Sequence, residues 1–235
     1  MTVEDIQAAL VVAGFDPGPV DGILGRRTIQ AIEAFQAARG LKVDGIVGPR
    51  TLARLFPRGQ PEPSPFGVPA NLPWLAEAHR LIGTRERPGA GSNEAILGWA
   101  EDLELADYDD DDIPWCGLFV AHCVGSQLPR EVLPTTPLGA RTWARFGDRV
   151  SPSVGAVMVF WRGSRDGWKG HVGFYWAEDD GAYQILGGNQ SNTVSITRIA
   201  RDRLLDARWP TTAMPPTVLT RTASTSGRLL SQNEA

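Results

Sequence analysis

The segment that decides the fold is residues 114–127, PWCGLFVAHCVGSQ, the clearest helix in the sequence. Proline is tolerated in the first turn of a helix because its missing N–H has no partner there. We therefore expect the helix to begin just before Pro114, with Asp112 as its N-cap. Helices are also predicted for residues 75–82 and 93–103. Short β-branched or aromatic segments then predict strands over residues 154–161, 171–176, 183–186 and 194–199. Helices followed by consecutive strands predict an α+β class with an antiparallel sheet.

Composition excludes several classes of protein. The chain has 235 residues and a formal net charge of -4, which lacks the basic surplus of a nucleic-acid-binding protein. No apolar run reaches the roughly 18 residues of a membrane span. Two cysteines are too few for a disulfide-dense scaffold or a four-cysteine zinc site. Acidic residues stand where a signal peptide carries basic ones, so we expect synthesis in the cytoplasm without a signal peptide.

The distribution of tryptophan and proline divides the chain. All eight tryptophans lie between Trp74 and Trp209, and the residues just before them, 57–73, include six prolines. Proline favours an extended spacer because it fixes φ and lacks an amide donor. A segment rich in Thr, Ser and Pro begins near Pro210. We predict a domain over 1–56, a linker over 57–73, a second domain over 74–210 and a flexible tail over 211–235.

The first domain contains an internal repeat. Residues 21–28, DGILGRRT, recur as DGIVGPRT at residues 44–51. In each copy the glycines permit a tight turn, and the threonine starts an apolar helical pattern. With an opening helix around Ile6 and Leu10, the two turns predict a compact bundle of three short helices.

This repeat carries a resemblance. Residues 16–55, DPGPVDGILGRRTIQAIEAFQAARGLKVDGIVGPRTLARL, resemble the small three-helix peptidoglycan-binding domain found on many cell-wall hydrolases. The resemblance implies bacterial peptidoglycan as the partner. A three-helix adaptor with another ligand is the alternative.

Cys116 is the candidate nucleophile. It lies in or near the first turn of the predicted helix, where unpaired amides and the helix dipole favour a thiolate. Carboxylates at residues 109–112 act in the opposite direction, so the sequence does not give the sign of the pKa shift. A small buried cysteine is the alternative. Cys123 lies two turns deeper on the same stripe and is expected in the core. A disulfide between them is excluded, because seven helical residues rise about 10 Å.

A thiol nucleophile needs a base within hydrogen-bond reach. His171 opens a predicted strand in which His171, Gly173 and Tyr175 share one face. A helix carrying Cys116 on that face would bring thiol and imidazole together. His122 points away along the helix, and His79 lies in an exposed-looking helix.

A third polar group usually orients the base. Three amide side chains follow or end the next strand, and chemistry alone does not separate them: Gln184, Asn189 and Gln190.

The same region carries a second resemblance, spanning about residues 72–210. The motifs are PWCGLFVAHCV, GHVGFYW and ILGGNQSNTVSI, followed by ARWP at residues 207–210. They resemble phage-associated cysteine peptidases related to the NlpC/P60 and CHAP hydrolases, which have papain-like folds. The resemblance implies Cys116 as nucleophile, His171 as base and Asn189 as the third residue, with no metal or organic cofactor. The chain departs from the pattern at Gly187, where some relatives carry Glu, and at Ala156, where the family often has Asp.

We therefore expect a monomeric, endolysin-like peptidoglycan hydrolase that cleaves an amide bond of the wall peptide. The alternatives are a non-catalytic wall-binding protein and a cysteine acyltransferase. Such an endolysin would reach the wall through a holin-type membrane lesion, whereas an effector or a tail lysin would arrive by another route. The acidic run at residues 107–112 is expected to be a solvated loop, with calcium binding as the alternative. Trp115 and Trp168 are candidates to line a groove.

Overall fold

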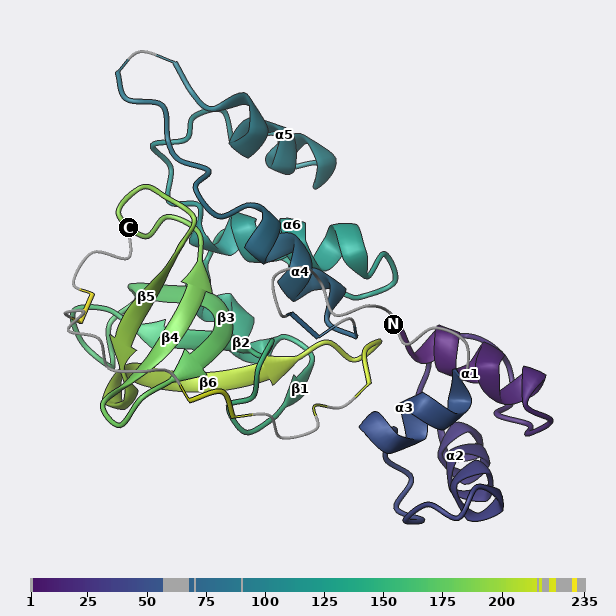
Figure 1. Cartoon of the computed structure of the whole chain (residues 1–235). Coiled ribbons are helices and arrows are strands. Elements are labelled where there is room, and N and C mark those ends of the chain that lie inside the picture. Colours follow the sequence, from purple (N-terminus) through teal and green to yellow (C-terminus); the bar gives the residue numbers. More distant parts are fainter. Residues whose placement is uncertain are drawn as a thin grey trace.

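The computed structural model describes residues 2–56, 68–69, 71–89, 91–214, 216, 220–222 and 230–231 (Figure 1). Helices come first along the chain and strands follow, so the α+β prediction is confirmed. Two hydrophobic clusters form among these residues, one in the first 56 residues and a larger one after them. Among the described residues, no helix has the length and apolar character needed to cross a membrane.

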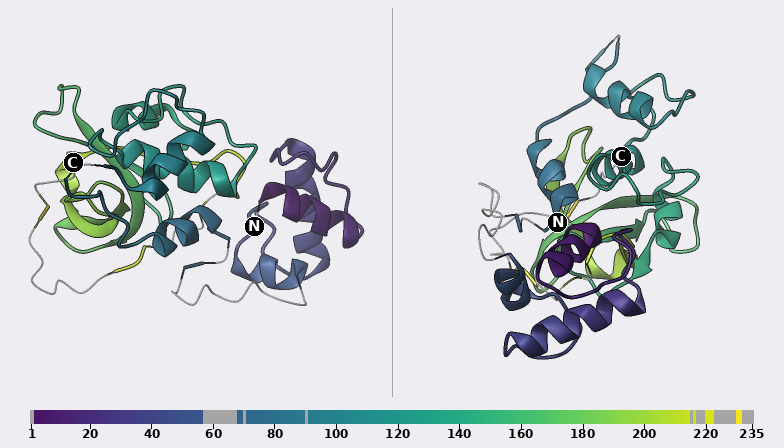
Figure 2. Two further views of the ribbon diagram at one scale, coloured as in Figure 1. Left: turned by 90° about the horizontal axis from the view of Figure 1, so that it is seen from above. Right: turned by 90° about the vertical axis from the view of Figure 1, so that its right-hand side faces the viewer.

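The N-terminal helical unit, residues 2–56, lies to one side of the larger unit in Figure 1 and in the left view of Figure 2. Its helices are α1 (Val3–Val12), α2 (Arg26–Ala38) and α3 (Pro49–Leu55). Thr2 caps α1 by accepting from the Asp5 amide, which satisfies a donor that the helix itself leaves unpaired. The apolar faces meet in a cluster made of Val3, Ile6, Leu10, Ala31, Ile32, Phe35, Val47 and Leu55, with Met214 from the far end of the chain.

A buried glutamine holds each of the two repeated turns. Gln36 on α2 donates to Asp44 Oδ1 (2.9 Å) and to the Ile46 carbonyl (2.8 Å). Its oxygen accepts from the Asp44 and Gly45 amides, both at 3.0 Å. Gln7 on α1 makes the same set of hydrogen bonds to the first turn, where its partners are Asp21, Gly22, Ile23 and Thr28. Each turn is thus fastened to the preceding helix by one side chain. The separation of Gln7 and Gln36 along the chain differs from the separation of the two turns, so the sequence repeat does not point to these glutamines.

The second unit is built on one antiparallel sheet. Among the described residues its strand order is β1-β6-β2-β3-β4-β5. The strands are β1 (Asp148–Arg149), β2 (Val157–Trp161), β3 (Gly170–Glu178), β4 (Ala182–Gly187), β5 (Ser195–Ala200) and β6 (Leu204–Trp209). Four of them match the predicted strands, whereas β1 and β6 were not predicted. Two short 3-10 helices, η1 (Ala140–Arg145) and η2 (Arg201–Arg203), complete the elements after α6.

Three α-helices stack on this sheet: α4 (Pro73–Arg80), α5 (Glu94–Asp102) and α6 (Cys116–Gln127). Helices α4 and α6 lie between the sheet and α5 (Figure 1). The ring of Phe119 on α6 packs on Phe174 of β3, with centroids 6.1 Å apart. Phe174 and His171 alternate on β3, so Phe119 packs on the face opposite His171 at this point of the strand. Cys116, at the start of α6, lies close to the Val172 amide, next to His171.

Helix α6 also begins later than predicted. Cys116 is its first residue, and Trp115 occupies the N-cap position without a side-chain hydrogen bond. Pro114 lies before the helix, and Asp112 is not its N-cap. A helix start without a side-chain cap leaves its first N–H groups available to other acceptors.

The predicted linker and tail are only partly described. Residues 57–67 lie outside the described residues. Val68 and Leu72, at the end of the predicted linker, are buried in the larger cluster, so they belong to the second unit's core. Thr211 and Thr212, predicted to start a flexible tail, are held by Glu131, whose two oxygens accept from both amides and both hydroxyls at 2.7–3.0 Å. These four hydrogen bonds attach the start of the predicted tail to the second unit.

The same segment joins the two units. The Val3 amide donates to the Thr212 carbonyl (3.2 Å), and Met214 is buried among the residues of the helical unit. Arg130, next to Glu131, forms an ion pair with Glu4 of α1 (3.3 Å). Residues 210–214 are thus a second connection between the units, in addition to the covalent one near residues 57–67.

We expect Gln36→Ala to lower the free energy of unfolding of the helical unit by about 1–3 kcal/mol, because it leaves buried donors and acceptors of the second turn without partners. Gln30→Ala is the matched control, since Gln30 is exposed on the same helix and should change stability by less than about 0.5 kcal/mol. Amide hydrogen exchange of residues 26–55 in the full chain measures both. Equal exchange in the two variants would show that the glutamine does not hold the turn.

Candidate active site

The Cys116 side chain lies at the N-terminus of α6, against the middle of the sheet. It is 3% exposed, and the Val172 amide on β3 lies close enough to its sulfur to lower its pKa. That amide belongs to the peptide bond that follows His171. The thiol of Cys116 and the residue carrying the imidazole are therefore brought together, although they are 55 positions apart in the sequence.

Burial raises the pKa of the Cys116 thiol above its ordinary value. The amides of Val172 and Gly117 and the more distant Arg162 cation oppose this shift, but burial outweighs them. Desolvation disfavours the charged form of any acid, so the resting side chain is a neutral thiol. We expected the helix N-terminus to favour a thiolate, but it does not by itself determine the direction of the pKa shift of Cys116.

The His171 ring is completely buried, and its Nε2 lies 3.2 Å from Gln190 Oε1. The Gln190 amide can take only one orientation, because its nitrogen donates to the carbonyls of Gly187 (3.1 Å) and Ser195. Its oxygen also accepts from the Thr197 hydroxyl (2.7 Å). An amide oxygen accepts and does not donate, so Nε2 of His171 carries the hydrogen. In the neutral ring this leaves Nδ1 as the basic nitrogen.

Asn189 lies one residue from Gln190 but faces the other way. Its amide fits its surroundings with the nitrogen donating to Glu86 Oε1 (3.1 Å) and the oxygen accepting from the Trp115 amide (3.2 Å). Gln184 lies opposite Ala177, well along β3 from His171. The amide beside the imidazole is thus that of Gln190, which corrects our choice of Asn189 as the partner of His171.

The turn that follows β4 explains why neighbouring amides diverge. Asn189, Ser191 and Asn192 have φ of 54°, 52° and 59°, in the left-handed region that non-glycine residues seldom adopt. This backbone directs Gln190 toward the sheet interior and Asn189 toward the start of α6. A cluster of such residues needs support from its surroundings, and the hydrogen bonds of Gln190 supply it.

Two glycines before this turn leave room for the site. A Cβ at Gly187 would lie 3.1 Å from both His171 Nε2 and Gln190 Oε1. A Cβ at Gly188 would lie 2.6 Å from the Phe119 Cβ. Gly187 thus lies against the imidazole and Gly188 against the start of α6, and the missing side chains leave room for both contacts. A Glu at position 187, as in some relatives of the resembled family, would displace Gln190.

The other two histidines and the second cysteine pack against residues outside the candidate site. His122 is stacked on Trp99 (5.0 Å) and lies 3.4 Å from Glu77 Oε1, and His79 is stacked on Trp176 (5.0 Å). Cys123 is fully buried in the larger cluster, where we expected it. Burial raises the pKa of its thiol well above the ordinary value.

The two candidate groove tryptophans differ. Trp115 is fully buried, with its Nε1 donating to Glu86 Oε1 (2.8 Å), so it does not line a groove. Trp168 is 83% exposed, between β2 and β3.

In the acidic run, the carboxylates of Asp110, Asp111 and Asp112 lie within 4.8 Å of one another. Asp111 is buried and accepts from the amides of Arg87 (3.0 Å) and Asn93 (2.7 Å). At least this carboxylate anchors a loop, so the run is not a simple solvated loop.

Comparison with known proteins bears on the helical unit. Residues 2–55 match the family described as "Putative peptidoglycan binding domain". The chain carries an N-terminal peptidoglycan-binding domain. The resemblance carried by the repeated turns is therefore confirmed.

Two curated relatives match short stretches. Over 54 residues the chain is 44% identical to the N-acetylmuramoyl-L-alanine amidase CwlM of Mycobacterium tuberculosis, covering 23% of this chain and 13% of the amidase. Over 39 residues it is 56% identical to the "Uncharacterized protein in bpoA1 3'region" of Kitasatospora aureofaciens, covering 16% of this chain and 33% of that protein. The chain thus spans a third or less of the length of these relatives. No solved structure matches it.

We expect the thiol of Cys116 to ionise at a higher pH than an ordinary cysteine, because burial raises its pKa. The test uses Cys123→Ala, in which Cys116 is the single thiol. The rate of alkylation by iodoacetamide is measured against pH, in the native protein and in urea. The native midpoint should lie at the higher pH. A native midpoint below that of the unfolded chain would contradict the prediction and indicate a preformed thiolate–imidazolium pair.

Proposed function

We propose that the protein is a peptidoglycan hydrolase with a papain-like catalytic unit, in which Cys116 is the nucleophile, His171 the base and Gln190 the residue that orients the base. The observation that carries this proposal is the position of Cys116. The Val172 amide, in the peptide bond that follows His171, lies close to its sulfur, and the Gln190 amide oxygen fixes the His171 ring. Nucleophile, base and orienting group in this order are the arrangement of acyl-transfer enzymes.

The substrate class follows from the N-terminal domain. A peptidoglycan-binding domain on the same chain holds the second unit close to wall polymer and so raises its local concentration there. The motif resemblance to NlpC/P60 and CHAP hydrolases agrees with an amide bond of the wall peptide as the target. The name of the CwlM relative points to the muramoyl–L-alanine bond, and a bond within the peptide is the alternative.

In the proposed reaction, the Cys116 sulfur attacks the carbonyl carbon of the scissile amide while His171 Nδ1 takes the thiol proton. The carbonyl π electrons move to the oxygen, and N–H groups at the start of α6, including that of Cys116, stabilise the oxyanion. The imidazolium then protonates the amine nitrogen, and the C–N bond breaks to leave a thioester. Water attacks the thioester as His171 accepts one of its protons. Cleavage of the C–S bond releases the carboxylic acid, and the proton returns to the sulfur.

The buried, neutral thiol determines when the proton moves. Because burial raises the pKa of Cys116, the thiolate forms as the attack proceeds and is not stored in the resting enzyme. The hydrogen bond from Nε2 of His171 to Gln190 stabilises the imidazolium that forms at that moment, since both ring nitrogens then carry hydrogen.

We expect Cys116→Ala to lower the release of soluble fragments from purified sacculi by at least about a thousandfold, because no other side chain supplies the attacking sulfur. Cosedimentation with sacculi should persist through the N-terminal domain. Cys123→Ala is the matched control and should keep most of the activity. Mass spectrometry of the fragments identifies the bond that is cut and separates hydrolysis from transfer to an amine. Full digestion by Cys116→Ala would overturn the cysteine mechanism.

We expect Gln190→Ala to lower kcat by at least about tenfold, because the imidazole loses the group that fixes its tautomer and direction. Asn189→Ala, which removes an amide from the same turn, should lower kcat less, and His171→Ala should lower it most. Gln190 also holds the turn, so thermal unfolding of each variant is recorded beside kcat and KM. If Asn189→Ala is crippled while Gln190→Ala retains full turnover, the assignment of Gln190 is wrong.

A further inference from the structure

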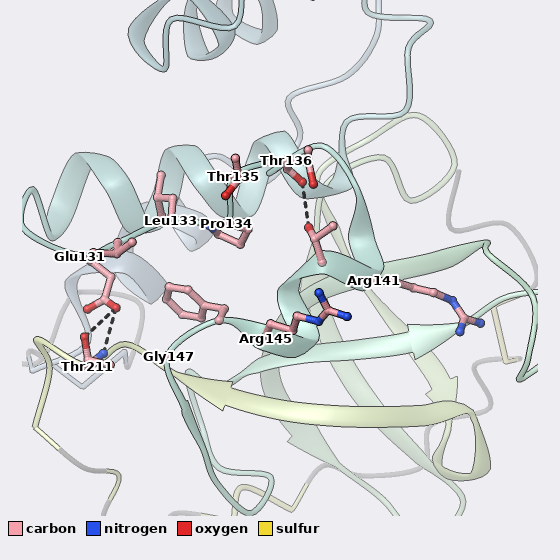
Figure 3. A pocket seen from close by; sticks show the side chains of 12 residues that line it. Glu131, Leu133, Pro134, Thr135, Thr136, Arg141, Arg145, Gly147 and Thr211 are labelled. Carbon is pink, nitrogen blue, oxygen red and sulfur yellow. Dashed lines mark hydrogen bonds between the residues drawn. The ribbon is translucent and has the colours of Figure 1, made fainter.

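A cavity of about 790 Å³ runs beside α6 (Figure 3). One wall is the chain that returns along the helix, residues 131–136, and the other is formed by residues 141–147. Its volume lies in the range of about 300–1,000 Å³ that is usual for ligand sites. Threonine hydroxyls and arginine side chains contribute to its lining, with Leu133, Pro134 and Phe146 between them.

The two ends of this cavity lie at the two functional parts of the molecule. At one end, Glu131 binds Thr211 (Figure 3), and the adjacent Thr212 accepts a hydrogen bond from Val3 of the peptidoglycan-binding domain. At the other end is Thr136. The carbonyls that follow it, of Pro137 and Leu138, approach Gly117 so closely that no Cβ fits there. Gly117 is the neighbour of Cys116, so the chain that lines this end of the cavity continues to the start of α6.

Two arginines line the cavity, and only one is available to a ligand. Arg141 donates to the carbonyls of Lys169 (2.8 Å), Arg165 (3.0 Å) and Ser164 (3.1 Å), so its guanidinium is used in holding the chain between β2 and β3. Arg145 lies between the two ends of the cavity (Figure 3) and is exposed. Within the described part of the chain, no carboxylate pairs with it. Glu131 is the acidic residue of the lining, and four donors from Thr211 and Thr212 already compensate its charge.

We propose that this cavity is the binding groove for a carboxylate-bearing peptide of the wall, and that Arg145 pairs with one of its carboxylates. The inference rests on the proposed function and adds to it the substrate's charge and the side chain that recognises it. A guanidinium binds a carboxylate through two parallel hydrogen bonds, which fixes orientation as well as adding affinity. Six residues of wall span at most about 20 Å, which accommodates an extended peptide of four residues, about 14 Å long.

The test measures binding of a synthetic muramoyl tetrapeptide by calorimetry, in the full chain carrying Cys116→Ala so that no turnover occurs. Adding Arg145→Gln should weaken binding at least about tenfold, because the paired cation is lost. Arg149→Gln is the matched control. It removes the same charge four residues away, from a side chain outside the cavity that pairs with Asp206, and should change affinity by less than about twofold. The same peptide with its carboxylates converted to carboxamides should bind weakly, and equally to all three proteins.

Equal binding of the acidic peptide by the Arg145→Gln and Arg149→Gln proteins would overturn the inference. With Cys116 restored, Arg145→Gln should raise KM more than it lowers kcat. The two proposals fail separately. If binding depends on Arg145 but the chain does not digest sacculi, the groove proposal stands and the hydrolase proposal is wrong. If Arg145→Gln digests sacculi with unchanged KM and unchanged peptide affinity, the hydrolase proposal stands and the groove proposal is wrong.

Discussion

The orientation of one side-chain amide, that of Gln190, determines the arrangement of the candidate active site. Its nitrogen is bound by the carbonyls of the turn that it closes, so its oxygen has to face His171. That contact places the hydrogen of the neutral imidazole on Nε2 and leaves the basic nitrogen on the other side of the ring. Gly187 leaves room for this side chain, and the left-handed backbone at 189, 191 and 192 shapes the turn that carries it.

Two glutamines of the N-terminal helical unit hold their turns in the same way. Gln7 and Gln36 each enter a turn from the preceding helix, donate to its carbonyl and aspartate oxygens, and accept from its amides. Glutamine suits this task because its amide both donates and accepts at the end of a side chain long enough to cross from one element to the next. A buried polar side chain that satisfies all of its bonds fixes a single conformation, whereas a partly satisfied one would cost stability.

Much of this architecture is predictable from the sequence. Apolar helical patterns located α4, α5 and α6, and short β-branched or aromatic segments bounded by Gly, Asp and Ser located four strands. Strand β6, LLDARW, was missed because Asp206 and Arg208 interrupt the apolar residues and pair with each other (2.9 Å). Residue type and position predicted Cys116 as nucleophile and His171 as base, and these roles stay predictions. The amide beside His171 was expected to be that of Asn189 and is that of Gln190, since the two residues are chemically alike and only the turn's backbone decides which one faces the ring. The sign of the Cys116 pKa shift depends on burial, which a linear motif does not contain.

The segment at residues 210–214 gives the molecule two attachments between its units where a single linker would give one. The segment that follows β6 contacts the start of α1 through Val3 and packs into the helical unit through Met214. The two units are therefore joined both by the linker and by this segment. A body held at two points cannot swing through the volume that one tether would allow. The distance between the peptidoglycan-binding domain and the second unit is therefore set by the folded molecule and not by the length of a linker. Under the proposed function, cuts would fall at a fixed distance from the bound wall polymer, and the released fragments would vary little in length.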